Sequence, residues 1–146
     1  NAKLQKKIWH QSSKWPNWSL RGIDPKYRVI AEIIANLLEN ACKYTGENAQ
    51  IGIYLFNSGI IVFDNGKKIA SEEVEKIFRK GYRGIASKNK NGTGVGLFLA
   101  RKLARNIGGE LYLLENDQDN QFYHEIQNLK KTNIFYLKLP TKQLHK

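Results

Sequence analysis

The stretch Asn91-Gly92-Thr93-Gly94-Val95-Gly96-Leu97 constrains this chain more than any other, because three alternating glycines open an apolar helical pattern. Glycine has no Cβ and adopts positive φ, so such a segment can lie closely against a ligand. The exposed N–H groups at a helix start attract anions such as phosphate. Nucleotide binding is therefore the leading hypothesis, and a plain helix start is the alternative interpretation of the same pattern.

The size of the chain limits it to one domain. Its 146 residues allow one well-buried core and are too few for two ordinary domains, so we expect a single domain over 1–146. The formal net charge of +11 indicates an anionic partner without selecting one, and the lysines are scattered rather than clustered. The absence of an initiator Met suggests an excised fragment.

Cysteine usage and hydropathy bear on the compartment. Cys42 is the single cysteine, which excludes an intrachain disulfide and agrees with a reducing environment. No apolar run approaches the roughly 18 residues of a membrane span, and the first residues lack a signal-peptide core. We expect a cytoplasmic domain, whose parent protein can still be attached to a membrane.

Hydrophobic periodicity predicts alternating helices and strands. Apolar residues at helical spacing predict a long helix over 28–43, which follows a start signal at Asp24-Pro25 and packs on a sheet. Two β-rich runs, 51–56 and 60–63, are separated by a hairpin signal at Asn57-Ser58-Gly59. The other predicted elements are strands at 5–9, 18–23, 110–114 and 133–139, a short helix from Ser71 to about Lys80, a basic lid over 81–93, a helix over 94–107 and an exposed excursion over 115–131.

Three polar residues are regularly spaced along the predicted long helix. Asn36, Asn40 and Lys43 are spaced i, i+4, i+7, which places them on one stripe away from the apolar face. Amide oxygens suit Mg²⁺ that keeps several waters and phosphate oxygens, while a lysine offsets phosphate charge. A solvated polar face is the alternative, and the glycine segment shifts the balance toward ligand binding.

Asp64 stands where a predicted strand ends, and Gly66 follows it. An ionised carboxylate only accepts hydrogen bonds, so it would pair with the exocyclic amino group of adenine and repel the carbonyl oxygen of guanine. The glycine would let a flat ring approach the backbone. Asp-Asn-Gly is also a common turn sequence, which is the alternative.

Cations precede the glycine segment. Arg83 is the candidate for contact with a terminal phosphate, because a guanidinium stabilises spread phosphate charge better than an ammonium. It is preferred over Lys80, with Arg79 and Lys88 as reserves, and a solvated basic loop is the alternative interpretation.

Four motifs in order, at 36–45, 64–66, 77–83 and 92–97, resemble the catalytic, ATP-binding domain of sensor histidine kinases. They are similar to the N box, first glycine box, F box and second glycine box of that family, and the resemblance covers about residues 20–140. It implies the Bergerat ATP-binding fold, an α/β two-layer sandwich in which a mixed, mostly antiparallel sheet carries three helices on one face. ATP would lie under a lid between the last two motifs.

The resemblance also implies roles for the matched residues. Asn40 would hold Mg²⁺, Tyr44 would lie near the nucleoside, and Asp64 would read adenine in a pocket that Gly66 lines. Phosphate contact and catalysis would fall to Asn36, Lys43 and Arg83. The nucleotide would also contact Gly92, Thr93, Gly94, Val95, Gly96 and Leu97, whose glycines would wrap the phosphates.

Two positions depart from the family pattern, and one element is missing. Lys68 replaces the second glycine of the first glycine box, and Gly81 replaces the second aromatic of the F box, so both bear on nucleotide affinity and lid docking. No histidine is followed by an acid and then proline at the phosphoacceptor spacing; His10 is followed by Gln11. The phosphorylated histidine would therefore belong to a separate dimerisation domain.

The leading functional hypothesis is transfer of the γ-phosphoryl group of Mg·ATP to that histidine, with a response regulator downstream and the isolated domain a monomer. Hydrolytic relatives carry a glutamate base where this chain has Asn36, and an amide cannot take a proton from water, although Glu32 and Glu39 lie nearby. A nucleotide sensor without turnover is a further alternative. Nucleic-acid binding by the basic surface ranks last and is not expected.

Overall fold

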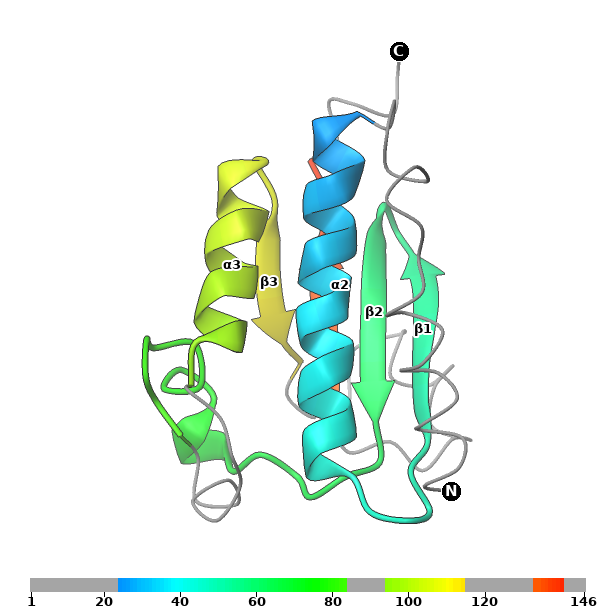
Figure 1. Cartoon of the computed structure of the whole chain (residues 1–146), viewed down its shortest axis with the longest axis vertical. Helices are drawn as coiled ribbons and strands as arrows, with labels where there is room; N and C mark the ends of the chain where they lie inside the picture. Colours follow the sequence, from blue (N-terminus) through cyan, green and yellow to red (C-terminus); the bar gives the residue numbers. More distant parts are fainter. Residues whose placement is uncertain (1–23, 84–93, 115–132, 141–146) are drawn as a thin grey trace.

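The computed structural model describes residues 24–83, 94–114 and 133–140 (Figure 1). The predicted strands 5–9 and 18–23, residues 84–93 of the predicted lid and the excursion 115–131 lie outside these ranges. The described elements run in the order α2 (Pro25–Tyr44), β1 (Ile51–Phe56), β2 (Gly59–Asp64), the 3-10 helix η2 (Ser71–Glu73), α3 (Gly96–Asn106), β3 (Glu110–Leu113) and β4 (Asn133–Lys138).

The strands form one sheet in the order β1-β2-β4-β3, and each neighbouring pair is antiparallel. Helices α2 and α3 lie side by side on one face of this sheet (Figure 1). The expected α/β two-layer sandwich is therefore confirmed. The expected number of three helices on that face is not, because the described residues contain two α-helices and one 3-10 turn.

The main core lies between the two helices and the sheet. Ile33 and Leu37 of α2 are 0% and 1% exposed, and Ala100 and Ala104 of α3 are both 0% exposed. Small alanines on α3 let the two helices approach closely. Strand β2 is buried along its whole length, since its alternate side chains join this core and a second cluster on the opposite face of the sheet.

Helix α2 begins and ends with side-chain caps. The Lys26 backbone N–H donates to Asp24 Oδ1 at 2.8 Å, and Pro25 occupies the first helical turn, where its missing N–H does no harm. At the other end, the Thr45 hydroxyl donates to the Ala41 carbonyl at 2.9 Å. The predicted start signal is thus confirmed, and the helix extends a little beyond the predicted 28–43 at both ends.

The predicted hairpin is also confirmed. Asn57 and Ser58 adopt φ of 40° and 62° between β1 and β2, as a tight turn that matches the strand twist requires. The turn fixes the register that carries β2 to its end at Asp64. This register decides where the candidate carboxylate emerges from the sheet.

The predicted helix from Ser71 to about Lys80 is wrong in type and length. The 3-10 helix η2 stops at Glu73, and turns follow it. Ser71 does not cap it either, because the residue at the N-cap is Ala70 and makes no side-chain cap bond. Burial of Glu73, Ile77 and Phe78 explains the difference, since the chain bends to bring these side chains inward at the expense of a regular helical ladder.

Candidate nucleotide site

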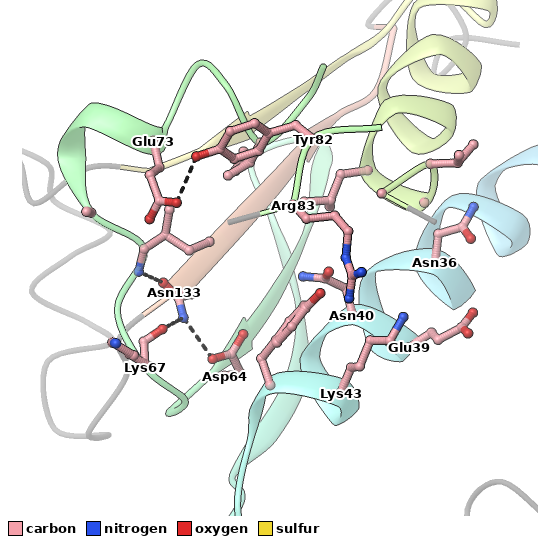
Figure 2. Close-up of a pocket in the computed structure, with 18 of the residues that line it drawn as sticks. Asn36, Glu39, Asn40, Lys43, Asp64, Lys67, Glu73, Tyr82, Arg83 and Asn133 are labelled. Atoms are coloured by element: carbon pink, nitrogen blue, oxygen red, sulfur yellow. Dashed lines mark hydrogen bonds between the residues drawn. The ribbon is translucent and has the colours of Figure 1, made fainter. Parts of the chain in front are cut away.

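A cavity of about 620 Å³ opens beside the C-terminal half of α2 (Figure 2). Its walls come from α2, from the end of β2 and the segment that follows it, from residues 82–83, from the start of α3 and from the first residue of β4. A volume of this size is typical of a pocket for a small ligand. Segments far apart in the sequence therefore meet at one hollow.

The helix α2 supplies one end of the cavity. Asn36, Asn40 and Lys43 are all half-buried and all line it, as their spacing predicts. Tyr44 lines the cavity as well. Figure 2 shows Arg83 reaching into the same space from the opposite wall. Two amides and two cations thus share one end, which we call the amide-cation end (Asn36, Asn40, Lys43, Arg83).

The other candidate cations and acids of the sequence analysis have different positions. Arg79 and Lys80 are exposed and do not line the cavity, while Lys88 lies outside the described residues. Among the acidic candidates, Glu39 lines the cavity, whereas Glu32 is exposed and does not. The preference for Arg83 as the cation of this segment is consistent with its position.

The glycine segment closes one side of the cavity. Gly94, Val95, Gly96 and Leu97 line it, while Gly92 and Thr93 lie outside the described residues. Gly94 has φ of 69°, and a Cβ there would lie 2.6 Å from the Tyr82 carbonyl oxygen, so only glycine fits. The Gly81 N–H donates to the Gly94 carbonyl at 3.0 Å, which joins the two stems of the predicted lid.

Asp64 occupies the other end of the cavity, which we call the carboxylate end (Asp64, Asn133). It is 5% exposed, and its Oδ1 accepts from the Gly66 N–H at 2.8 Å and from Asn133 Nδ2 at 3.1 Å. Burial raises the pKa of Asp64 above its ordinary value of 3.8, and these two hydrogen bonds lower it by a smaller amount. The site therefore holds an acceptor carboxylate away from bulk water.

Gly66, which the resemblance places beside adenine, lies between the end of β2 and the end of α2. It is not among the residues that line the cavity. A Cβ at Gly66 would lie 2.9 Å from the Tyr44 carbonyl oxygen and 3.0 Å from Asp64 Oδ1. The glycine thus lets the chain leaving β2 pass close to the end of α2, and its N–H fixes the carboxylate.

Both departures from the family pattern have a local explanation. Lys68 is exposed at the cavity wall and is not among the described non-glycine residues with positive φ, so a side chain at this position strains nothing. Gly81 has φ of 78°. The next residue, Tyr82, packs against the core, and its hydroxyl donates to Glu73 Oε1 at 2.8 Å.

Sequence reasoning missed Asn133. It is the first residue of β4, is 5% exposed and pairs directly with Asp64 across the sheet. The only signal in the sequence is a polar residue at the start of a predicted strand, and such residues are common. Glu73 and Tyr82 also line the cavity, and the sequence analysis gave neither of them a role in the site.

The sequence model of the histidine kinase-, DNA gyrase B- and HSP90-like ATPase family matches residues 26–143. The chain is 40% identical over 86 residues to the sensor histidine kinase Hik2 of Thermosynechococcus vestitus, covering 56% of this chain and 22% of that protein. It is 31% identical over 110 residues to the sensor protein EvgS of Escherichia coli K12, covering 70% of this chain and 9% of that protein. The chain thus spans less than a quarter of either relative.

Solved structures show the same fold. The mycobacterial sensor histidine kinase MprB is similar with a TM-score of 0.59 and 22% identity, over 76% of this chain and 72% of that one. The catalytic domain of the histidine kinase ThkA is similar with a TM-score of 0.57 and 25% identity, over 77% and 66%. Full-length ShkA, solved in complex with AMPPNP, has a TM-score of 0.51 and 17% identity, over 75% and 20%.

Proposed function

Since this chain belongs to the histidine kinase-, DNA gyrase B- and HSP90-like ATPase family, we propose that it binds Mg·ATP and transfers the γ-phosphoryl group to a histidine on a separate dimerisation domain. The observation that carries the proposal is that the amide-cation end and the carboxylate end belong to one cavity. A nucleoside triphosphate has a matching polarity, with a hydrogen-bonding base at one end and a polyanion at the other.

The amide-cation end suits a triphosphate. Lys43 and Arg83 supply two positive charges, and the segment 94–97 brings backbone groups to the start of α3. Asn40 would hold Mg²⁺ through its amide oxygen. The described residues contain no group of three or more His, Cys, Asp and Glu side chains that could hold a metal ion alone. One amide oxygen together with phosphate oxygens and water is the coordination that Mg²⁺ adopts on nucleotides.

The chemistry of the cavity favours transfer over hydrolysis. Hydrolysis requires a base that takes a proton from water, and the amide of Asn36 cannot do this. A neutral histidine already carries a lone pair, so phosphoryl transfer to it needs positioning and charge stabilisation from this domain. Glu39 is the one carboxylate of α2 that lines the cavity, which makes hydrolysis the alternative to exclude by experiment.

The other expectations concern the whole protein. A response regulator would accept the phosphoryl group downstream, and the isolated domain would be a monomer. No helix in the described part of the chain is long and apolar enough to cross a membrane. A cytoplasmic location is the proposal, because kinase chemistry uses cytoplasmic ATP.

The test is an assay with γ-labelled ATP, this domain and the histidine-bearing domain of the same parent protein. We expect acid-labile phosphohistidine on the second domain. Loss of the label transfer in Asn36→Ala but not in Asn48→Ala, an exposed asparagine outside the cavity, would tie transfer to the site. Free phosphate without phosphohistidine would establish a hydrolase instead, and nucleotide binding without either product would establish a sensor.

A further inference from the structure

The side chain of Asn133 makes three hydrogen bonds that connect β4 to the end of β2 and to the segment that follows it (Figure 2). Its Nδ2 donates to Asp64 Oδ1 at 3.1 Å and to the Lys67 carbonyl at 2.9 Å. Its Oδ1 accepts from the Ile69 N–H at 2.9 Å. A side chain that is 5% exposed is therefore fixed at both of its polar atoms.

These bonds leave the amide only one orientation. The Ile69 N–H can only donate, so the oxygen of Asn133 must face it. The nitrogen then faces two acceptors, Asp64 Oδ1 and the Lys67 carbonyl. A flipped amide would set an oxygen against two oxygens and an N–H against an N–H, which costs several hydrogen bonds in a buried place.

The same bonds fix the carboxylate. The Gly66 N–H and Asn133 Nδ2 both donate to Oδ1 of Asp64, so rotation of the carboxylate would break two hydrogen bonds at once. In Figure 2 the other carboxylate oxygen points away from Asn133, toward the cavity. Asn133, together with the Gly66 N–H, thus fixes the direction in which the second oxygen of Asp64 faces.

We propose that Asn133 is a positioning residue for base recognition, which orients Asp64 so that its cavity-facing oxygen accepts a hydrogen bond from the exocyclic amino group of adenine. The proposal rests on the proposed function and deepens it, because it assigns the selection of ATP over GTP to a pair of residues on β2 and β4. Its carrying observation is the network of hydrogen bonds that joins Asn133, Asp64 and the cavity wall at 67–69.

The hydrogen bonds of Asn133 also fix the part of the cavity wall that Ile69 forms. Ile69 lines the cavity, and its backbone N–H is held by Asn133. An apolar side chain beside a hydrogen-bonding carboxylate is the arrangement that receives a flat, polar-edged ring. One amide therefore fixes the position of Ile69 relative to the carboxylate of Asp64.

The ionisation of Asp64 gives the proposal a measurable consequence, a change in how ATP affinity depends on pH. Burial raises the pKa of Asp64, and the hydrogen bond from Asn133 opposes this rise. Removing Asn133 would raise that pKa further, because the ionised form loses a donor. A protonated carboxyl no longer accepts at both oxygens, so ATP affinity should fall as the pH drops through the pKa of Asp64, and the fall should begin at a higher pH without Asn133.

The test compares Asn133→Ala with Asn65→Ala, a matched control. Asn65 is an asparagine too, and it follows Asp64 directly in the sequence. Its side chain accepts from the Gln50 N–H at 2.7 Å and donates to the Asn48 carbonyl at 3.0 Å. Neither of these hydrogen bonds involves the carboxylate of Asp64, and Asn65 is not among the described residues that line the cavity. Both variants lose two or more hydrogen bonds to the backbone, so a merely structural effect should appear in both.

Calorimetry with ATP and GTP between pH 5 and 8 provides the readout. We expect Asn133→Ala to lose about tenfold in ATP affinity and most of the preference over GTP, and to shift the acidic fall of ATP affinity to higher pH. Asn65→Ala should keep both the preference and the pH midpoint. The pKa of Asp64, measured by carboxyl NMR in the nucleotide-free domain, should rise in Asn133→Ala alone.

A second variant guards against misfolding. Asn133→Thr keeps one hydroxyl donor on a residue that strands favour, and we expect it to retain part of the preference and of the normal pH midpoint. If the wild-type domain prefers ATP and Asn133→Ala keeps that preference and the pH midpoint, the inference fails while the proposed function stands. If the wild-type domain binds no ATP, the proposed function fails and takes the inference with it.

Discussion

The two ends of the cavity are built from different kinds of structure. At the amide-cation end, three of the four residues, Asn36, Asn40 and Lys43, come from eight residues of one helix and are half-buried, and Arg83 joins them from a distant segment. At the carboxylate end, Asp64 and Asn133 are 69 residues apart in sequence, are each 5% exposed and hydrogen-bond each other. Binding of a hydrated metal and phosphates tolerates adjustable side chains, whereas discrimination between bases needs a fixed acceptor.

The largest expected effect is at the amide-cation end. Asn40→Ala should lower the affinity for Mg·ATP about 100-fold and leave the affinity for metal-free ATP nearly unchanged, because it removes the proposed metal ligand. Titration calorimetry with Mg²⁺ and with EDTA measures both, and Asn48→Ala is the exposed control. Equal losses of ATP affinity with and without Mg²⁺ would show that Asn40 is not a metal ligand and would weaken the contrast between the two ends of the cavity.

The next largest effect is at the carboxylate end. Asp64→Asn should lower ATP affinity roughly 30-fold and relax the preference over GTP, since the amide places a donor among groups that already donate to position 64. Its Mg²⁺ dependence should not change. Asp24→Asn is a matched control, because asparagine caps a helix as well as aspartate does. Unchanged discrimination in Asp64→Asn would count against base recognition by this residue.

Gly81 and Gly94, which are joined by a backbone hydrogen bond, allow the cost of a steric clash to be separated from the cost of backbone strain. Gly94→Ala combines φ of 69° with a Cβ 2.6 Å from the Tyr82 carbonyl oxygen, and should lower the free energy of unfolding by about 2 kcal/mol. Gly81→Ala has φ of 78° but no atom within 4 Å of its Cβ, so about 1 kcal/mol is expected. Denaturant unfolding measures both, and equal losses would show that the close approach to Tyr82 is unimportant.

The smallest expected effect is at Lys68, one of the two positions where the chain departs from its family's pattern. Lys68→Gly should change ATP affinity by about twofold or less, because Lys68 is exposed and its backbone does not need glycine. The measurement is the same ATP titration. A gain of tenfold or more would show that the lysine restricts nucleotide binding at the carboxylate end.

Local patterns predicted the parts of the fold and site that depend on neighbouring residues. The long helix, the hairpin at Asn57 and Ser58 and the strand end at Asp64 all follow from spacing and turn chemistry, and each is confirmed. The helix expected after Ser71 fails because burial of Glu73 and Phe78 overrides local propensity. The expected role of Gly66 beside a base stays a prediction; Gly66 lies next to the Tyr44 carbonyl oxygen and is not among the residues that line the cavity.

The sequence alone determined that Asn36, Asn40 and Lys43 share one face, because helical periodicity is a property of consecutive residues. The sequence also shows the cations, Lys43 and Arg83, and the glycines at 92, 94 and 96 that a phosphate site would use. Only the tertiary structure decided that Asn133 faces Asp64, because the pairing of β2 with β4 brings distant residues together through sheet hydrogen bonds and core packing. Periodicity in the sequence cannot predict which two strands pair, because the segment between β2 and β4 sets no fixed distance between paired residues.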